Sequence, residues 1–213
     1  MTVVAIDGPA GTGKSTVARA VADRLGFRLL DSGAMYRSVA LAARERSGDP
    51  AALASSLRID LGSDGRVLLD GREVTEEIRA PAVSEAASRV AANPAVRTAM
   101  VEQQRRLLER GDWVAEGRDI GTVVAPSAEV KIFLTADPAE RARRRAAELG
   151  VDAGQVLAEQ ARRDERDQKR AVSPLVPAPD AEVLDTTGLG ADEVTDRILA
   201  LVTLRRRPGP PLA

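Results

Sequence analysis

A short glycine-rich stretch near the amino terminus constrains this chain more than any other part of it. Residues 8–15 read Gly-Pro-Ala-Gly-Thr-Gly-Lys-Ser and follow directly on the apolar run Val3–Ile6. This spacing matches G-x-x-x-x-G-K-[ST], a loop whose backbone N–H groups surround a di- or triphosphate. The glycines allow a sharp turn and bring bare backbone against the anion. Lys14 would add a charge at the outer phosphates, and Ser15 would offer a hydroxyl to Mg²⁺.

The residues after the loop support the same interpretation. Val17, Val21 and Leu25 recur at helical spacing, and Gly26 is a stop signal. A strand, the loop and a helix therefore come in the order that a phosphate site needs, with the positive end of the helix facing the anion. The alternative is a glycine turn that carries a lysine by chance, and this context favours the nucleotide site.

The overall composition excludes several kinds of chemistry. The chain has 213 residues, 44% of them hydrophobic, and a formal net charge of −1, so no strong field favours nucleic acid or membranes. It has no cysteine and no histidine, which excludes disulfides, thiolate metal sites and imidazole bases. No apolar run is long enough to span a membrane and no signal pattern opens the chain, so we expect a cytoplasmic protein.

Arginine is unusually abundant. Only Lys14, Lys131 and Lys169 are lysines among the 31 basic residues, which leaves 28 arginines. A GC-rich genome or a hot habitat would explain this excess without any function, yet arginine also suits bidentate contacts to phosphate. Whether any of these arginines has a function must therefore be judged from their positions in the sequence, not from their number.

Strand and helix patterns alternate along the chain. Candidate strands are Val3–Ile6, Phe27–Leu30, Trp113–Ala115, Val130–Leu134 and Glu182–Leu184. Helical patterns follow the loop, run from Met35 toward Gly48, cover 81–92, restart at Asn93, open with a capping-box-like pattern at 137–140, and return at 152–170 and 192–204. Short runs between turn residues at 58–75 predict a small antiparallel hairpin or meander. The alternation predicts parallel βαβ units and hence the α/β class.

Polar groups follow three of the candidate strands. Gly8–Lys14, Asp31–Ser32 and Glu116–Asp119 each stand where a strand ends. Because ligands of parallel sheets bind beyond the carboxyl ends of the strands, we expect these three segments to face one crevice.

A cluster of arginines lies on one face of the helix predicted at 152–170. Arg163, Asp167 and Arg170 are spaced i, i+4 and i+7, with Arg166 beside them. They could be a solvated face with surface ion pairs, or arginines that close over reacting phosphates. Arg141, Arg143, Arg144 and Arg145 lie within pairing distance of Glu140 and Glu148, and we interpret that earlier cluster as structural.

The absence of histidine indicates which kind of group could accept a phosphoryl group from the bound nucleotide. Phosphoryl transfer depends mostly on positioning and on stabilising charge on the equatorial oxygens. A phosphate monoester loses its second proton near pH ~6, so it is already a nucleophile at neutral pH and needs no base. Phosphate-to-phosphate transfer therefore fits this chain better than phosphorylation of a sugar or alcohol, for which an Asp would have to act as base.

Longer segments carry a more particular resemblance. They are Ile6–Thr16, Leu30–Arg37, Ala86–Ala91, Glu116–Val124 and Arg163–Leu175, with L-D-S-G-A-M-Y-R and G-R-D-I-G-T the most distinctive stretches. In sequence and in order they resemble the bacterial cytidylate kinases, and the similarity runs from about Val3 to Leu204. Glu116 stands where that family more often has Asp before Gly-Arg-Asp, so the acidic character is kept.

The resemblance implies a fold, a domain organisation and a reaction. The fold would be of the P-loop NTPase type, three layers around a five-stranded parallel sheet, with a monophosphate-binding insertion and a short helical lid. A single kinase domain would span 1–205, with its core at 1–33, 111–149 and 171–205, the monophosphate-binding region at 34–110, the lid at about 150–170 and a tail at 206–213. The implied reaction moves the γ-phosphate of ATP to CMP or dCMP with Mg²⁺. We further expect a monomer that binds neither nucleic acid nor membrane.

The resemblance also assigns site residues position by position. ATP would be bound by Gly8, Pro9, Ala10, Gly11, Thr12, Gly13, Lys14, Ser15 and Thr16, with Mg²⁺ near Ser15, mostly through water and phosphates. CMP would be bound by Ser32, Arg37, Ser88, Arg97, Arg118, Asp119, Asp167 and Arg170. The catalytic set would be Lys14, Arg118, Arg163 and Arg170. Arg37 and Arg118 would hold the CMP phosphate, and Asp167 would approach the ribose.

The three residues implied to read the cytosine edge are Ser88, Arg97 and Asp119. Cytosine presents an amino donor beside ring acceptors, so Asp119 could accept and Arg97 could donate. UMP carries a carbonyl in place of the amino group and would leave the carboxylate unpaired. The alternatives are that Ser88 is a small residue at a helix contact and that Arg97 is a surface arginine.

Two other functions stay open from the sequence alone. One is another small P-loop kinase of the uridylate, adenylate or shikimate type, against which the arrangement of Ser32, Arg37 and Asp119 argues. The other is a P-loop regulator or nucleic-acid-associated ATPase whose arginine helix contacts a phosphate backbone. The near-neutral charge and the few aromatic residues disfavour that second alternative.

Overall fold

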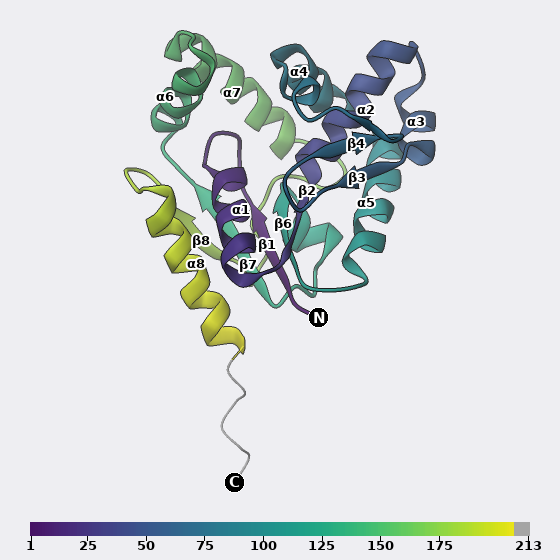
Figure 1. Cartoon of the computed structure of the whole chain (residues 1–213). Helices are drawn as coiled ribbons and strands as arrows, with labels where there is room; N and C mark the ends of the chain where they lie inside the picture. The colour runs from purple at the N-terminus through teal and green to yellow at the C-terminus, as the bar shows by residue number, and fades with distance from the viewer. Residues whose placement is uncertain (207–213) are drawn as a thin grey trace.

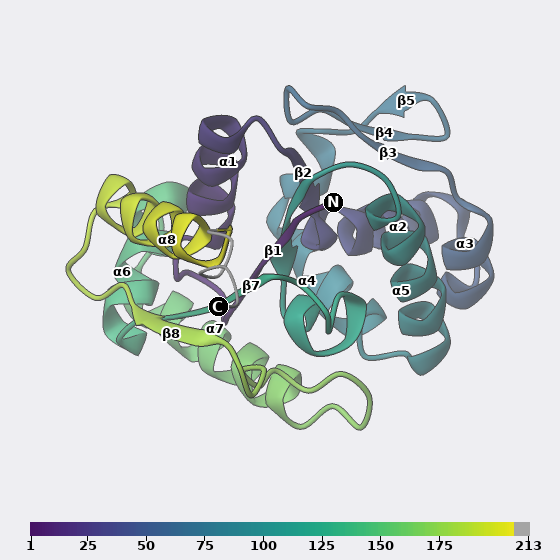
Figure 2. The ribbon, with the colours of Figure 1, turned by 90° about the horizontal axis from the view of Figure 1, so that it is seen from below.

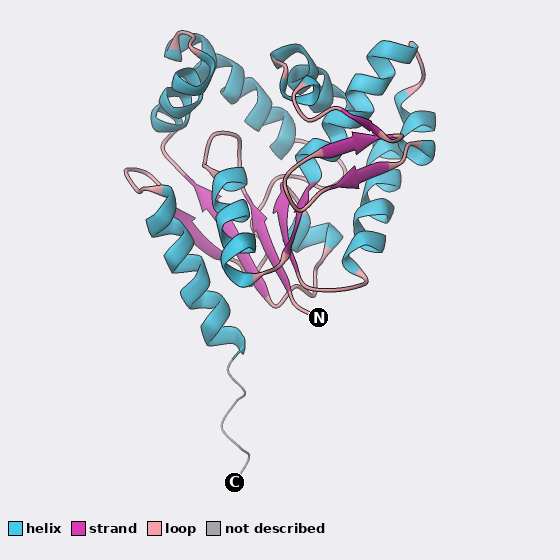
Figure 3. Ribbon diagram, viewed as in Figure 1, coloured by secondary structure: helices cyan, strands magenta, loops and turns pink. Residues whose placement is uncertain are grey.

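The protein folds around a five-stranded parallel β-sheet in the computed structural model, which describes residues 1–206 (Figures 1 and 3). The strands are β1 (Val3–Asp7), β2 (Arg28–Asp31), β6 (Trp113–Gly117), β7 (Val130–Thr135) and β8 (Glu182–Asp185), in the order β2-β6-β1-β7-β8. Every neighbouring pair in this sheet runs parallel. The predicted α/β class with five parallel strands is confirmed.

Helices cover both faces of the sheet and make three layers (Figure 2). α1 (Lys14–Leu25) and α8 (Ala191–Arg206) lie on one face, and α2 (Ser32–Arg46) and α5 (Pro94–Leu108) lie on the other. Side chains of β1 alternate between two cores: Val4 and Ile6 join the core that contains α1 and α8, whereas Val3 and Ala5 join the core that contains α2. Because β1 is buried on both sides, its residues before Asp7 form an unbroken apolar run.

The chain between β2 and β6 adds further helices and a second sheet. Besides α2 and α5 it contains α3 (Pro50–Ser56), β3 (Ile59–Leu61), β4 (Val67–Leu69), β5 (Arg72–Glu73), the 3₁₀ turn η1 (Glu77–Arg79) and α4 (Pro81–Val90). β3, β4 and β5 pair antiparallel, which confirms the meander predicted at 58–75. α3 was not predicted, because its seven residues are too short for a hydrophobic period and its signal is only Asp49 as N-cap before Pro50.

Two helices, α6 (Pro138–Leu149) and α7 (Ala153–Gln168), form a hairpin above the carboxyl ends of the strands (Figure 1). α2 and α4 rise above the same edge of the sheet on the other side. One turn of π-helix, η2 (Ile120–Val124), follows β6. The hairpin and the region between β2 and β6 therefore flank the edge of the sheet at which residues 8–15 lie. We call these residues the phosphate loop, after the motif that they match.

The capping-box prediction at 137–140 is half right. Asp137 caps α6 by accepting the N–H groups of Ala139 and Glu140. Glu140 does not bond back to the cap, because its carboxylate pairs with Arg143 and Arg144.

At the carboxyl-terminal end, α8 continues to Arg206, so the predicted tail at 206–213 starts one residue too early. The rest of that prediction, 207–213, lies outside the described residues. Within residues 1–206, no helix has the length and apolar character needed to cross a membrane.

Candidate active site

The glycine-rich loop joins β1 to α1, and its geometry explains two of its glycines. Gly8 and Gly11 have φ angles of 148° and 79°, a region that side chains disfavour. A Cβ on Gly8 would overlap the carbonyl oxygen of Leu134, and one on Gly11 would lie 2.8 Å from Nε2 of Gln160. The loop therefore needs bare backbone here, as the motif predicts.

Side-chain donors hold carbonyl oxygens of the loop. Nζ of Lys14 donates to the carbonyl of Pro9 at 2.6 Å, and Oγ1 of Thr12 donates to the same oxygen at 3.2 Å. Oγ1 of Thr186 donates to the carbonyl of Thr12 at 3.2 Å. Carbonyls engaged in this way leave the N–H groups of the loop available to a phosphate. Ser15 and Thr16 are exposed in the first turn of α1.

Lys14 is buried among other charges. Burial lowers the pKa of its ammonium group, and the guanidinium groups of Arg118 and Arg163 lower that pKa further, against the opposing effect of Glu116. Positive groups buried this close together repel one another, and an anion between them would relieve the repulsion. A phosphate is such an anion.

The carboxyl ends of β1, β2 and β6 lie side by side at one edge of the sheet. Oγ of Ser15 donates to Oε2 of Glu116 at 3.0 Å, and Oγ of Ser32 donates to the carbonyl oxygen of Glu116 at 2.8 Å. Burial raises the pKa of the Glu116 carboxyl, and the neighbouring carboxylate of Asp31 raises it further. Glu116 thus links the first turn of α1 to the start of α2.

Ser15 and Glu116 are the residues that fit a Mg²⁺ ion. Hydroxyl and carboxylate oxygens suit this cation, and Oε1 of Glu116 is buried with no partner among the described residues. Residues 1–206 contain no group of three or more acidic, histidine or cysteine side chains that could hold a metal ion. Most ligands of a Mg²⁺ ion here would therefore be waters and phosphate oxygens.

Asp7 ends β1 and holds the start of η2. Its two carboxylate oxygens accept the N–H groups of Ile120 at 2.9 Å and Gly121 at 2.8 Å. Burial raises the pKa of Asp7 to about 6. The sequence analysis did not single out Asp7, although a carboxylate at the end of a buried apolar strand is a recognisable signal, because a buried charge needs partners.

Arginines from separate stretches of the chain lie close together near this edge. Nε of Arg118, which follows β6, donates to Oδ2 of Asp167 at 3.0 Å, and Arg170 pairs with the other oxygen of the same carboxylate. Arg163 is half-buried near them, and desolvation, together with the charge of Arg118, lowers the pKa of Arg163 to about 10. The face of α7 that carries Arg163 and Asp167 is therefore packed into the molecule, and a solvated face is the wrong reading.

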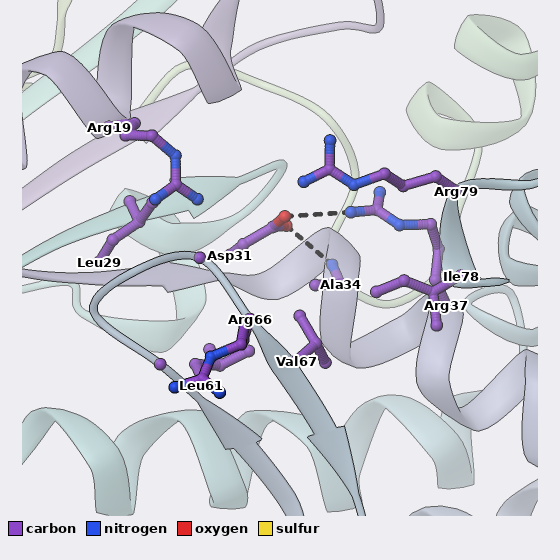
Figure 4. Close-up of a pocket in the computed structure, with 12 residues that line it drawn as sticks. Arg19, Leu29, Asp31, Ala34, Arg37, Leu61, Arg66, Val67, Ile78 and Arg79 are labelled. Carbon is purple, nitrogen blue, oxygen red and sulfur yellow. Dashed lines mark hydrogen bonds and ion pairs between the residues drawn. The ribbon is translucent and has the colours of Figure 1, made fainter. Parts of the chain in front are cut away.

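Arg37 lies near the same group and is held by Asp31. Its NH2 lies 3.0 Å from Oδ2 of Asp31, and Oδ1 of Asp31 caps α2 by accepting the N–H of Ala34 at 2.7 Å (Figure 4). The charge of Arg37 also contributes to the lowered pKa of Arg163. Asp31 thus fixes an arginine of the predicted site, a role that its place in the sequence, at a strand end expected to face the site, does not indicate.

Ser88, Arg97 and Asp119 belong to α4, to α5 and to the residues that follow β6, and Arg97 donates to the carbonyl of Ala91 at the end of α4 at 3.3 Å. Arg97 and Asp119 form an ion pair, and the guanidinium of Arg97 lies 5.5 Å from the ring centroid of Tyr36. Arg97 is only 2% exposed, so the alternative of a surface arginine is wrong. Ser88 is buried, and its Oγ accepts a hydrogen bond from Arg166 of α7 at 2.7 Å. Ser88 thus lies at a contact between α4 and α7, and its role in reading the base stays a prediction.

Several buried polar atoms of this region have no partner among residues 1–206. They are Nε of Arg37, Arg97, Arg163 and Arg170 and Oε1 of Glu116. Buried guanidinium N–H groups are costly to leave unpaired. Phosphate oxygens and the acceptor atoms of a base could satisfy them.

Arg141 departs from the prediction for its cluster. Arg143, Arg144 and Arg145 pair with Glu140 and Glu148, as expected. Arg141 is instead buried, donates to the carbonyl of Ala10 in the phosphate loop at 3.0 Å, and pairs with Asp164 of α7 at 2.6 Å. Its signal in the sequence is its place beside Ala142 and Ala146 on the buried face of α6.

A parallel sheet with a G-x-x-x-x-G-K-[ST] loop at one strand end and arginines at two others is the arrangement by which P-loop kinases move a phosphoryl group between a nucleotide and an acceptor. A family model described as cytidylate kinase matches residues 4–204 of this sequence. The chain belongs to the cytidylate kinase family, which makes it a nucleoside monophosphate kinase.

Individual relatives agree with the family match. The cytidylate kinase of Pelotomaculum thermopropionicum is 51% identical over 219 residues, covering 96% of this chain and 97% of the relative. That of Solibacter usitatus is 50% identical over 216 residues, covering 95% and 93%. Among solved structures, a gluconokinase from Sinorhizobium meliloti 1021 is similar with a TM-score of 0.52 at 16% identity, covering 96% and 93%, which shows a shared fold alone. The family membership favours the predicted kinase over the other P-loop classes considered above.

Proposed function

We propose that this protein transfers the γ-phosphate of ATP to CMP or dCMP and releases ADP and CDP or dCDP. The observation that carries the proposal is the gathering of Lys14, Arg118, Arg163 and Arg170 at one edge of the sheet, from stretches far apart in the sequence. Donor phosphates at the loop and an acceptor phosphate at Arg37 and Arg118 would then lie end to end. Family membership supports the choice of nucleotides.

The chemistry fits a chain without histidine. The acceptor phosphate is largely a dianion at neutral pH, so its oxygen attacks the γ-phosphorus without losing a proton to a base. The new P–O bond forms as the bond from the γ-phosphorus to its bridging oxygen breaks, and the released electron pair stays on ADP. Arg118, Arg163 and Arg170 would donate hydrogen bonds to the oxygens on which charge accumulates, and the excluded water would strengthen these interactions.

The donor half of the site would be the phosphate loop. The backbone from Gly8 to Gly13, the ammonium of Lys14 and the hydroxyls of Ser15 and Thr16 would bind the phosphates of ATP. Ser15, with Glu116 beside it, would hold Mg²⁺, mostly through water and phosphate oxygens. Mg²⁺ supplies neutralising charge to the β- and γ-phosphates when bound.

The acceptor half would use residues on both sides of the crevice. Asp167 would approach the ribose, Arg37 and Arg118 would hold the phosphate, and Ser32 would belong to the same CMP-binding set. Ser88, Arg97 and Asp119 would read the cytosine edge. Asp119 would accept from the cytosine amino group while still contacting Arg97, whose remaining N–H groups would donate to the ring acceptors.

The predicted domain organisation also implies that two segments move when the nucleotides bind. The monophosphate-binding region at 34–110 and the lid at about 150–170 would close over the two nucleotides and exclude water. We expect a monomer in the cytoplasm that acts on small molecules and binds neither nucleic acid nor membrane. Gel filtration and cell fractionation would test these expectations.

Steady-state kinetics with four acceptors test the proposed function. We expect kcat/KM to be highest for CMP or dCMP and lower for UMP and AMP by about tenfold or more. The reaction should require both ATP and Mg²⁺. If UMP outpaced CMP by about tenfold, the assignment of the acceptor would be wrong.

A further inference from the structure

Arg141 of α6 ties the phosphate loop to the α6–α7 hairpin. Its NH1 donates to the carbonyl of Ala10 at 3.0 Å and lies 2.6 Å from Oδ2 of Asp164, and its Nε donates to the carbonyl of Ala136 at 3.2 Å. The side chains of Arg141 and Asp164 are only 8% and 12% exposed. Three acceptors around one planar, buried guanidinium group fix its position.

The bond to Ala10 sets the orientation of one peptide unit of the loop. A trans peptide is planar, so its carbonyl and its N–H point in opposite directions. A carbonyl of Ala10 turned toward α6 therefore directs the N–H of Gly11 away from α6 and leaves it available to a phosphate. Lys14 and Thr186 hold the neighbouring carbonyls of Pro9 and Thr12. Arg141 thus completes a set of donors that fixes the carbonyl side of the loop.

The loop tip also packs closely on the hairpin. A Cβ on Gly11 would lie 2.8 Å from Nε2 of Gln160 and 3.0 Å from both the Cβ and the carbonyl oxygen of Arg141. Gln160 and Asp164 are one turn apart on α7, and Asp164 directly follows Arg163 in the sequence. The helix that carries Arg163 therefore contacts the loop both directly and through Arg141.

We infer that Arg141 is a positioning residue for the donor nucleotide, held by Asp164, and that it joins the phosphate loop to the helix that carries Arg163. This rests on the proposed function, because it takes the phosphates of ATP to bind at the loop. Arg141 acts on the reaction through backbone and through α7. An arginine that only joined α6 to α7 would affect stability and leave the affinity for nucleotides unchanged.

The test compares nucleotide affinities of four variants with those of the wild type. They are Arg141→Gln, Asp164→Asn, the double variant and the matched control Arg145→Gln, whose arginine lies on the same helix and pairs with Glu148 at 2.8 Å. Calorimetry gives the Kd of ADP and of CMP separately, and steady-state kinetics give kcat and the KM of each substrate. We expect Arg141→Gln to weaken ADP about tenfold, to raise the KM for ATP to a similar extent, and to leave the affinity for CMP within about twofold.

The double variant tests whether Arg141 and Asp164 act together on the affinity for ADP. The double variant should be little worse than Arg141→Gln alone, because both residues act through one contact. Arg141→Lys keeps the charge but cannot reach Ala10 and Asp164 together, so an intermediate affinity for ADP is expected, and this variant serves if Arg141→Gln does not fold. Arg145→Gln should bind ADP as the wild type does.

Two results would overturn the inference. One is a folded Arg141 variant that binds ADP as tightly as the wild type, and the other is an equal loss of affinity for ADP and CMP, which would indicate general damage to the fold. A wild-type protein that failed to bind ADP would refute the proposed function itself and this inference with it. Thermal melts of each variant separate loss of folding from loss of affinity.

Discussion

Single residues in this protein are held in place by buried pairs of opposite charge. Asp167 pairs with Arg118 and Arg170, and Asp119 pairs with Arg97. A buried ion pair adds little net stability, because both groups lose their hydration. We therefore attribute these pairs to the positioning of the arginines that contact a nucleotide in the proposed function.

Asp119 is expected to discriminate between bases. Asp119→Ala removes the acceptor for the cytosine amino group and leaves Arg97 without its ion-pair partner. We expect kcat/KM for CMP to fall by about 100-fold and the preference for CMP over UMP to disappear. Kinetics with both acceptors check this, with Asp196→Ala on α8 as the control, since Asp196 is exposed and pairs with Arg24. A variant that kept the preference would refute the base-reading role.

Lys14 and Arg118 are expected to act mainly on the transition state. Lys14→Ala and Arg118→Ala should each cost about 3 kcal/mol in kcat/KM, because each removes a positive charge from the proposed site of transfer. Neither should unfold the protein, since both changes also relieve repulsion among buried positive groups. The control is Lys169→Ala, whose lysine is exposed and pairs with Glu165. A loss of activity that followed the loss of folded protein would contradict the prediction.

Asp7 is expected to make stability depend on pH. Burial raises its pKa from 3.8 to about 6 in the folded state, so the contribution of Asp7 is full below about pH 4 and is lost as the pH rises through about 6. The loss is on the order of 2 to 3 kcal/mol. In urea unfolding, the free energy of unfolding of the wild type should fall relative to that of Asp7→Asn between about pH 4 and 6 and then level off. A constant difference over that range would contradict this.

The sequence predicted those residues that belong to local patterns. The loop and the three strand ends each follow an apolar run, so their common edge of the sheet follows from parallel pairing alone. The partners of the arginines are not local. Arg97 and Asp119 are 22 positions apart, Arg118 and Asp167 are 49 apart, and Arg141 lies 131 positions from Ala10. These contacts depend on how whole helices pack, which periodicity does not determine.

At the scale of secondary structure, capping residues mark the helix starts well and hydrophobic periods mark the longer helices. Asn93 caps α5 and Asp137 caps α6, as the sequence indicates. The short helix α3 was missed, since one turn or two give no period. Glu140 was expected to complete a capping box, but its carboxylate instead forms ion pairs with Arg143 and Arg144. Competition of this kind between neighbours limits such predictions.

α7 is expected to respond to both nucleotides at once. Arg166 of α7 already contacts Ser88 of α4, so the helix touches the region between β2 and β6 as well as the phosphate loop. Bound phosphates would give acceptors to Arg163 and Arg170 and hold α7 more firmly. We expect amide hydrogen exchange across 150–170 to slow more with ADP and CMP together than with either alone. Exchange across 192–204 in α8 should stay unchanged, and an unchanged rate at 150–170 would count against a lid.

In the whole molecule, the faces of the sheet form the hydrophobic cores, and the carboxyl edge of the sheet carries the candidate active site. Its two faces are buried under helices and form the two large cores, whereas its carboxyl edge carries the loop, Glu116 and the arginines. The α6–α7 hairpin stands on one side of that edge and α2 with α4 on the other (Figure 1). Two nucleotides can thus be bound by different segments and still place their phosphates in one crevice.

The central claim is that arginines from distant stretches of the chain surround a phosphoryl group in transit above the phosphate loop. The most direct measurement is a crystal structure with ADP, Mg²⁺, CMP and a metal fluoride that imitates the transferred group. We expect Lys14, Arg118, Arg163 and Arg170 all to lie within hydrogen-bond distance of the fluoride or of the oxygens beside it. If the guanidinium groups instead kept only their carboxylate partners and faced away from both nucleotides, the account would be contradicted.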